Sequence, residues 1–161
     1  MPTVPVEERV AIEELTRLYG LFCDTRHFEK LAHLFTKECV YDESVVGGTP
    51  VTSRADLLQL FRNASSRLGP MIHICTNQVI SAFSGRTASG LCHVLAEGLF
   101  NVGGEQKPFR IFGCYDDRYS KEGDRWYFKS RVLRLLVPSQ GAPTLGGITY
   151  DAMAAHLSTV P

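Results

Sequence analysis

His73 is the side chain in this sequence best suited to acid–base chemistry. It lies in the run M-I-H-I-C-T-N, residues 71–77, which is otherwise apolar and is typical of a strand. An imidazole titrates near neutral pH and can take a proton from a bound molecule. A histidine held in a core by one hydrogen bond would give the same pattern, so the residue types alone leave both interpretations open.

Asp24 is the carboxylate that could assist such a base. It follows an apolar helical segment and precedes Thr25 and Arg26. A carboxylate that accepts a hydrogen bond from one ring N–H of His73 would fix the tautomer and stabilise the imidazolium. However, Asp24 is two residues past Phe22, about 200° around a helix, so periodicity does not place it in a pocket. A helix-end carboxylate paired with Arg26 is the alternative.

Three tyrosines are candidates for the hydrogen-bond donors that a leaving group or a developing enolate requires. Tyr19 is in the first helical segment, Tyr41 is in a short strand-like run, and Tyr115 ends an apolar run. A buried phenol usually needs a polar partner. Each of them could equally be a packing residue.

Two further candidates for substrate binding, Arg131 and Asn77, come from strand alternation. Arg131 and Arg134 are three residues apart, so on a regular strand they point to opposite faces, and we favour Arg131 for the inner face. Asn77 is four residues after His73 and is expected on the same face, where it could line the pocket or satisfy a buried hydrogen bond.

The remaining patterns exclude several kinds of site. His93 and Glu97 share a face of one strand, and a solvent-facing pair is the interpretation we favour. The sequence has no H-x-x-x-H metal pattern, nucleophile elbow or glycine-rich phosphate loop. Its five cysteines are odd in number and include no C-x-x-C pair. We therefore predict no metal and no cofactor.

The composition limits the kinds of binding partner that we expect. Lys plus Arg and Asp plus Glu number 17 each, so the net charge is zero and no global field attracts nucleic acid or an anionic membrane. No apolar stretch reaches the ~20 residues of a membrane span, and the start shows no secretory pattern. We expect a cytoplasmic domain, and the Phe, Leu, Met and Cys residues expected to line its pocket favour a small apolar or aromatic ligand.

Helices come first in the chain. Apolar residues recur at helical spacing over 7–26, and shorter helices are predicted over 27–35 and 53–68. The last of these opens on S-R-A-D, an approximate capping box. A short strand is predicted over 39–46, ending at a G-G-T-P turn.

Long strands follow. Four extended runs rich in β-branched and aromatic residues are separated by short turns, which predicts antiparallel hairpins. The runs are 71–84, 88–102, 109–121 and 125–137. We predict one α+β domain over 1–161, with N-terminal helices packed on a strongly curved, mostly antiparallel sheet that forms a cone around a pocket. The tail 138–161 is partly irregular, with a last helix over 149–159.

The order of these elements and several segments resemble the SnoaL-like group of the nuclear-transport-factor-2-like superfamily, nearest to its scytalone dehydratase and hexachlorocyclohexane dehydrochlorinase branch. The similarity extends from Glu7 to about Val137. The segments that carry it are I-E-E-L-T-R-L-Y-G-L-F-C-D (12–24), H-F-E-K-L-A-H-L-F-T-K-E-C-V-Y (27–41), I-H-I-C-T-N (72–77) and Y-D-D-R-Y-S-K-E-G-D-R-W-Y-F (115–128).

This resemblance implies catalytic roles. In related enzymes an Asp at the end of the first helix pairs with a His at the start of the first long strand, and these positions match Asp24 and His73. The spacing of Tyr19 and Asp24 is similar to that of the Tyr and Asp of dehydratases in the same branch. The implied function is a cofactor-independent lyase of the dehydratase or dehydrohalogenase type, with His73 as the base and Asp24 orienting it.

Three alternatives stay open, because this scaffold hosts many functions. An isomerase or cyclase would use the same pair without a leaving group. A ligand carrier, or a domain like the small subunit of an aromatic-ring dioxygenase, would use no catalysis. The resemblance also implies a homodimer or homotrimer through the open sheet face, for which the apolar strands 109–115 and 126–137 are suited.

Overall fold

The first predicted helix forms as α1, Val6–Asp24, in the computed structural model, which describes residues 2–137. Pro5 precedes it, and the two acidic residues Glu7 and Glu8 lie in its first turn, where they complement the helix dipole. Its buried face carries apolar residues one or two turns apart, among them Ile12, Leu15 and Tyr19. This face packs α1 against the sheet along strand β3, Leu68–Phe83.

The next helix is shorter than predicted. Helix α2 spans Phe28–Ala32, and strand β1, Phe35–Asp42, begins inside the range that the apolar spacing assigns to a helix. The reason is tertiary: the backbone N–H of Phe128 donates to the Leu34 carbonyl (2.9 Å), and Phe35 pairs with Phe128 across a parallel strand contact. The predicted strand also ends early, because Ser44–Val46 form a 3-10 helix, η1.

The third helix follows a strand that the sequence pattern did not reveal. Strand β2 has only three residues, Val51–Ser53, and α3 spans Arg54–Ala64. The predicted cap forms: the backbone N–H of Asp56 donates to the Ser53 hydroxyl (3.1 Å), which in turn donates to the Asp56 carboxylate (2.7 Å).

The four long strands form where they were predicted. They are β3 (Leu68–Phe83), β4 (Thr87–Val102), β5 (Glu105–Glu122) and β6 (Arg125–Leu135). They pair as successive antiparallel hairpins, and β1 joins the free side of β6 in parallel, giving the order β2-β1-β6-β5-β4-β3. The prediction of a mostly antiparallel sheet is confirmed, and the last helix predicted, over 149–159, lies outside the described residues.

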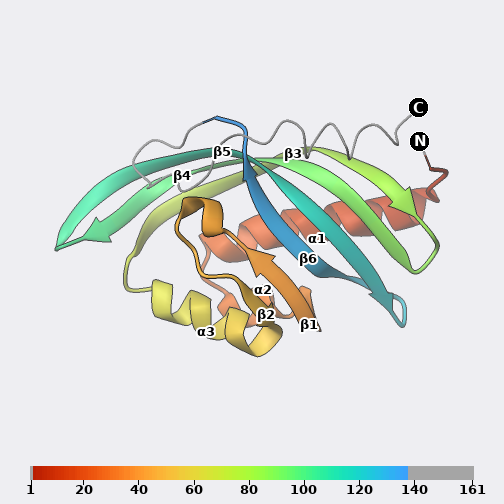
Figure 1. Cartoon of the computed structure of the whole chain (residues 1–161), viewed down its shortest axis with the longest axis horizontal. Coiled ribbons are helices and arrows are strands. Elements are labelled where there is room, and N and C mark those ends of the chain that lie inside the picture. Colours follow the sequence, from red (N-terminus) through yellow and green to blue (C-terminus); the bar gives the residue numbers. More distant parts are fainter. Residues whose placement is uncertain (1, 138–161) are drawn as a thin grey trace.

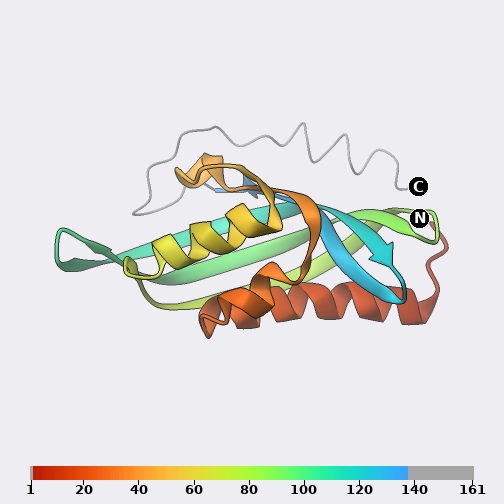
Figure 2. The ribbon, with the colours of Figure 1, turned by 90° about the horizontal axis from the view of Figure 1, so that it is seen from below.

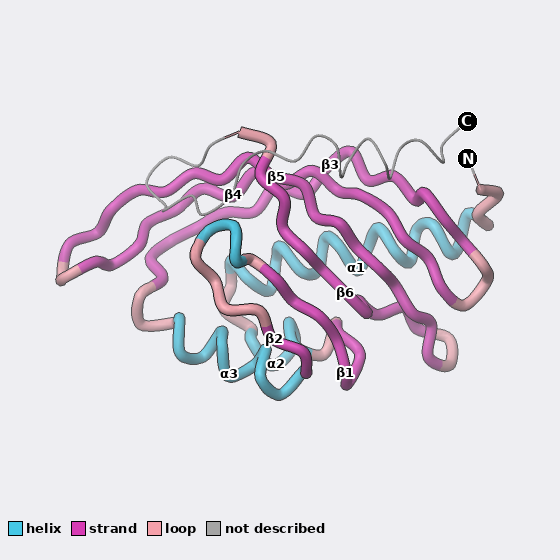
Figure 3. Tube along the Cα trace, in the orientation of Figure 1, coloured by secondary structure: helices cyan, strands magenta, loops and turns pink. Residues whose placement is uncertain are grey.

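The sheet is strongly curved, and its helices lie on the concave side (Figure 1). The turned view shows α1 and α3 over that same side of the sheet (Figure 2). In the tube view, the β4–β5 hairpin extends past the helices at one end of the sheet, whereas α1 reaches the other end (Figure 3). The predicted α+β cone is therefore confirmed, and its concave side faces the helices. No helix among residues 2–137 is both long and apolar enough to cross a membrane.

Candidate active site

A cavity of about 420 Å³ lies between the helices and the concave face of the sheet. This volume is in the range of small-molecule sites. Most of its wall is apolar and comes from both layers, with contributions that include Phe28, Phe61, Met71, Phe100, Phe109 and Leu133. Its polar groups include Tyr19, Tyr41, Glu43, His73 and Tyr115. An apolar cavity with a few polar groups suits an apolar or aromatic ligand.

Asp24 and His73 meet at the wall of this cavity. The Asp24 Oδ1 atom lies 2.6 Å from His73 Nδ1, and Asp24 Oδ2 accepts the backbone N–H of His73 at 2.9 Å. An ionised carboxylate only accepts hydrogen bonds, so Nδ1 carries a ring proton, and in the neutral imidazole Nε2 has the lone pair. The His73 side chain is 11% exposed and that of Asp24 is 20% exposed. The carboxylate thus holds both the ring and the backbone of the candidate base.

The close approach of α1 to β3 explains how two residues 49 positions apart come together. Gly20 faces β3, and a Cβ atom placed there would lie only 3.3 Å from the His73 Cβ. Asp24 is one helical turn after Gly20 and therefore lies on the same face of α1. The sequence analysis measured the position of Asp24 around the helix from Phe22, but Phe22 is not on the buried face. That face passes through Gly20 and Cys23 instead.

Two tyrosines share a hydrogen bond inside the cavity. The Tyr19 and Tyr41 hydroxyl oxygens are 3.0 Å apart, and the Tyr19 ring stands edge-on to the His73 ring. Tyr115 also lines the cavity and packs edge-on against Tyr19. Burial raises the pKa of all three phenols well above their usual value, so they keep their protons and act as hydrogen-bond donors. All three predicted tyrosines therefore lie at the cavity.

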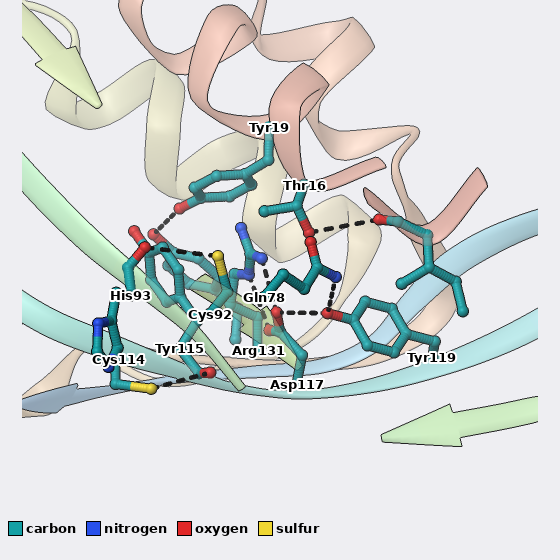
Figure 4. A network of polar contacts seen from close by, with 12 residues as sticks. Thr16, Tyr19, Gln78, Cys92, His93, Cys114, Tyr115, Asp117, Tyr119 and Arg131 are labelled. Atoms are coloured by element: carbon teal, nitrogen blue, oxygen red, sulfur yellow. Dashed lines mark hydrogen bonds and ion pairs between the residues drawn. The ribbon is translucent and has the colours of Figure 1, made fainter. Parts of the chain in front are cut away.

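Arg131 faces the interior as predicted, but it lies behind the cavity wall. Its guanidinium makes two hydrogen bonds to the Asp117 carboxylate, from Nε (2.9 Å) and Nη2 (2.7 Å). Figure 4 shows this pair next to Tyr19 and Tyr115. Burial lowers the pKa of Arg131, but the Asp117 charge outweighs it and holds the pKa well above its usual value. Arg134 lies 3.7 Å from Asp116, the neighbour of Asp117 on the other face of β5.

Asn77 does not line the cavity, which corrects the expectation from strand alternation. Asn77 has a positive φ of 52°, and the pairing of β3 with β4 shifts register between Thr76 and Val79. This bulge gives the inward position to Gln78, whose amide donates to the Tyr119 hydroxyl (3.1 Å). The Asn77 side chain instead lies on the outside of the sheet, 3.2 Å from a ring nitrogen of His93.

The outer face also holds Glu97, which forms an ion pair with Arg110 at 2.7 Å. Both side chains are almost half exposed. His93 and Glu97 are thus solvent-facing, as the sequence favoured. Among residues 2–137, no group of three or more His, Cys, Asp or Glu side chains could hold a metal ion.

Glu43 is a polar cavity residue that was not predicted from the sequence. It directly precedes η1 and lines the cavity beside Tyr41. Burial raises the pKa of its carboxyl group, against opposing interactions with Tyr41, His73 and Arg131. The signal was present in the sequence, since Glu43 is two residues after Tyr41 and alternation puts the two on one face.

A family model described as a SnoaL-like domain matches residues 4–132. The chain belongs to the SnoaL-like domain family. The SnoaL-like part of the resemblance seen in the sequence is thereby confirmed. Among curated proteins, none has a sequence that matches this SnoaL-like domain.

Solved structures share the fold of this SnoaL-like domain at low identity. A proposed aromatic-ring hydroxylase of Novosphingobium aromaticivorans is 24% identical, with a TM-score of 0.81 over 88% of this chain and 96% of the other. A proposed scytalone dehydratase of the same organism is 24% identical, with a TM-score of 0.73 over 88% and 95%. A hexachlorocyclohexane dehydrochlorinase, LinA type 2, is 21% identical, with a TM-score of 0.74 over 89% and 92%.

Proposed function

We propose that this SnoaL-like domain is a cofactor-independent lyase that removes a proton from a small apolar or aromatic molecule and expels a leaving group. The observation that carries the proposal is the 2.6 Å contact between Asp24 and His73 at the wall of an apolar cavity. Two of the similar structures are described as a dehydratase and a dehydrochlorinase, both elimination enzymes, which supports this reaction class.

His73 is the base in this proposal. With Nδ1–H bonded to Asp24, the lone pair on Nε2 is available for a proton next to an activating carbonyl. Asp24 stabilises the imidazolium that forms, because the ion pair strengthens as the ring gains charge. A positioned general base of this kind typically contributes about 10²–10⁴-fold to the rate.

The tyrosines serve the electrophilic side of the reaction. Tyr19, Tyr41 and Tyr115 offer neutral O–H groups inside the same cavity as His73. Their donors stabilise the negative charge that develops on the enolate oxygen or on the leaving group. Arg131 supports them from behind, since its guanidinium carbon lies 4.2 Å and 4.1 Å from the ring centroids of Tyr19 and Tyr115.

The test uses aromatic ketones with a leaving group on the β-carbon. A panel built around the acetone–benzaldehyde aldol adduct and its β-chloro analogue is suitable, because both give benzylideneacetone, which is followed by absorbance and mass. In D₂O, deuterium incorporation at the α-carbon reports proton abstraction alone. We expect turnover by the wild type and a loss of about 10²–10⁴-fold in His73→Gln.

His93→Gln is the matched control, because His93 lies on the outer face of the sheet. Full activity in His73→Gln, or the absence of both turnover and exchange across the panel, would contradict the proposal. Exchange without loss of the β-substituent would point to an isomerase that uses the same pair. Binding of the panel without exchange would point to a ligand carrier.

A further inference from the structure

Glu43 is held firmly at the cavity by its own backbone. Its carbonyl oxygen accepts the N–H groups of Val46 and Gly48, both at 3.0 Å, which closes the turn around η1. Gly47 ends that turn with a φ of 86°, a conformation that favours glycine. Gly48 has no side chain, which leaves room for Glu43, because a Cβ at Gly48 would lie 3.2 Å from the Glu43 Cβ. The loop therefore fixes the backbone of Glu43, whose side chain lines the cavity.

Two tyrosine hydroxyl groups connect the surroundings of the Glu43 carboxyl with those of the dyad, the pair formed by Asp24 and His73. Tyr41 and the Glu43 carboxyl interact, and the Tyr41 hydroxyl oxygen is 3.0 Å from that of Tyr19. Tyr19 in turn packs edge-on to His73, with ring centroids 6.3 Å apart. All four side chains line the same cavity.

The surroundings of Glu43 favour its protonated form. Desolvation is the largest effect on the carboxyl and raises its pKa, while interactions with Tyr41, His73 and Arg131 oppose that rise. The titratable groups that interact with Glu43 come from α1, β1, β3, β5 and β6. They are Tyr19, Cys23, Tyr41, Asp42, His73, Tyr115 and Arg131.

We infer that Glu43 supplies the proton for an oxygen leaving group through Tyr41 and Tyr19, so that the eliminated molecule is water. This inference rests on the lyase function proposed above and narrows its substrate class. A halide ion leaves without a proton, whereas a hydroxyl group at neutral pH needs one. A built-in acid therefore selects apolar or aromatic β-hydroxy carbonyl compounds over β-halo compounds.

The step balances within the site. The α-carbon–hydrogen bond breaks, its proton moves to His73 Nε2, and its electron pair becomes the new carbon–carbon double bond. The carbon–oxygen bond breaks with its electron pair on oxygen, which takes a proton from the tyrosine pair. Glu43 replaces that proton through Tyr41 and becomes a carboxylate. The imidazolium then returns one proton to Glu43 by way of the released water, which restores the starting state.

The experiment compares wild type, Glu43→Gln and Glu43→Asp on the two matched adducts, with α-carbon deuterium exchange measured in parallel. Gln keeps the size of Glu but cannot donate a carboxylic proton. We expect Glu43→Gln to eliminate water about 100-fold more slowly while chloride elimination and deuterium exchange change far less. Glu43→Asp should recover part of the loss, because it retains an acid. Glu14→Gln, on the outside of α1, is the control.

The outcomes separate the two proposals. Equal rates of water loss in wild type and Glu43→Gln would overturn the role of Glu43. A uniform loss of water elimination, chloride elimination and deuterium exchange would also overturn it, because the carboxyl would then only shape the cavity. Wild-type elimination of chloride but not of water would overturn the substrate class. Absence of exchange in the wild type would instead contradict His73 as the base, and thus the lyase function itself.

Discussion

The Asp117 carboxylate and the Arg131 guanidinium form a fully buried pair, with both side chains 0% exposed and two hydrogen bonds of 2.9 Å and 2.7 Å. The Tyr119 hydroxyl donates to the same carboxylate at 2.9 Å. The guanidinium also lies over three aromatic rings, those of Tyr19, Tyr115 and Phe128. The pair therefore supports two tyrosines of the cavity from behind without reaching the cavity itself.

The first prediction concerns this pair. Asp117→Asn leaves the Arg131 charge buried without compensation, which typically costs about 3–5 kcal/mol in the free energy of unfolding. Urea denaturation measures the loss. The exposed pair of Glu97 and Arg110 is the matched control, because Glu97→Gln should cost no more than about 1 kcal/mol. Similar effects of the two substitutions would mean that the buried pair contributes little to stability.

Alternation along the strands predicted much of the site but could not reveal two bulges. On β6, Ser130 and Phe128 pair with consecutive residues of β5, so that Lys129 is the extra residue. Phe128 and Arg131 can therefore both face the interior although they are three residues apart. On β3 the bulge at Asn77 has the opposite effect and removes that residue from the inner face. Bulges depend on cross-strand pairing, which one sequence does not display.

The helix–sheet contact shows a second limit of the sequence argument. The residue types identified His73 as a base, but only the family resemblance placed Asp24 beside it. The physical cause is local: Gly20 allows α1 to approach β3 closely, so the residue one turn later reaches His73. Glu43 could have been found from its spacing to Tyr41. The position of its loop at the cavity depends on the turn around η1 and on tertiary packing.

The second prediction tests that approach with Gly20→Ala. Alanine favours the helix by about 1 kcal/mol, but its Cβ would lie 3.3 Å from the His73 Cβ and 3.5 Å from the His73 carbonyl oxygen. Because β3 must move slightly away, we expect turnover to fall about 10-fold while the melting temperature changes little. Leu21→Ala, at an exposed position of the same helix, is the control. Unchanged turnover in Gly20→Ala would show that the dyad tolerates the shift.

The third prediction concerns Glu43 and pH. The pKa of its carboxyl is raised by burial above the usual 4.5, so the folded state binds this proton more tightly than the unfolded state does. The contribution of Glu43 to stability is therefore greatest below 4.5 and declines as pH rises through the folded pKa. Glutamine has no such titration. The melting temperature of Glu43→Gln relative to wild type should thus increase between acidic and neutral pH.

Thermal unfolding across this pH range measures the trend, and the same series with Glu14→Gln shows whether it belongs to Glu43. A variant that is uniformly less stable at every pH would indicate that the carboxyl group holds the fold together. If Glu43→Gln is more stable than wild type at neutral pH and also eliminates water more slowly, Glu43 costs stability and contributes to activity.

The fourth prediction concerns self-association, which we propose occurs through the outer face of the sheet. Ile72 and Ile74 on β3 are 53% and 46% exposed, and Phe112 on β5 is 39% exposed. Ile74 and Phe112 pair with the same residue of β4, Leu95, so they form one apolar area. We expect a dimer or trimer by analytical ultracentrifugation, and a monomer in Phe112→Glu. Val10→Glu, which alters an exposed apolar residue of α1, should leave the mass unchanged.

The last prediction concerns the dyad itself. Asp24 accepts two hydrogen bonds from His73, one from the ring and one from the backbone N–H. Asparagine has only one acceptor oxygen, and its amino group is a donor. In Asp24→Asn, either the amino group faces one of the two His73 N–H groups, or the ring proton moves to Nε2 so that Nδ1 can accept from the amino group. In the second case the lone pair no longer faces the cavity. Turnover should fall by about 10⁴-fold, as for the comparable change in a catalytic triad, with the cavity retained.

Nitrogen NMR of the His73 ring distinguishes these outcomes, because it reports which nitrogen carries the proton. We expect the Nδ1–H form in wild type and a shift toward Nε2–H in Asp24→Asn, accompanied by the loss of deuterium exchange. Asp116→Asn, which changes a carboxylate near Arg134 on the outer face, is the control and should leave both the tautomer and the exchange rate unaltered. An Asp24→Asn variant that keeps the wild-type tautomer and rate would mean that His73 needs no orienting carboxylate.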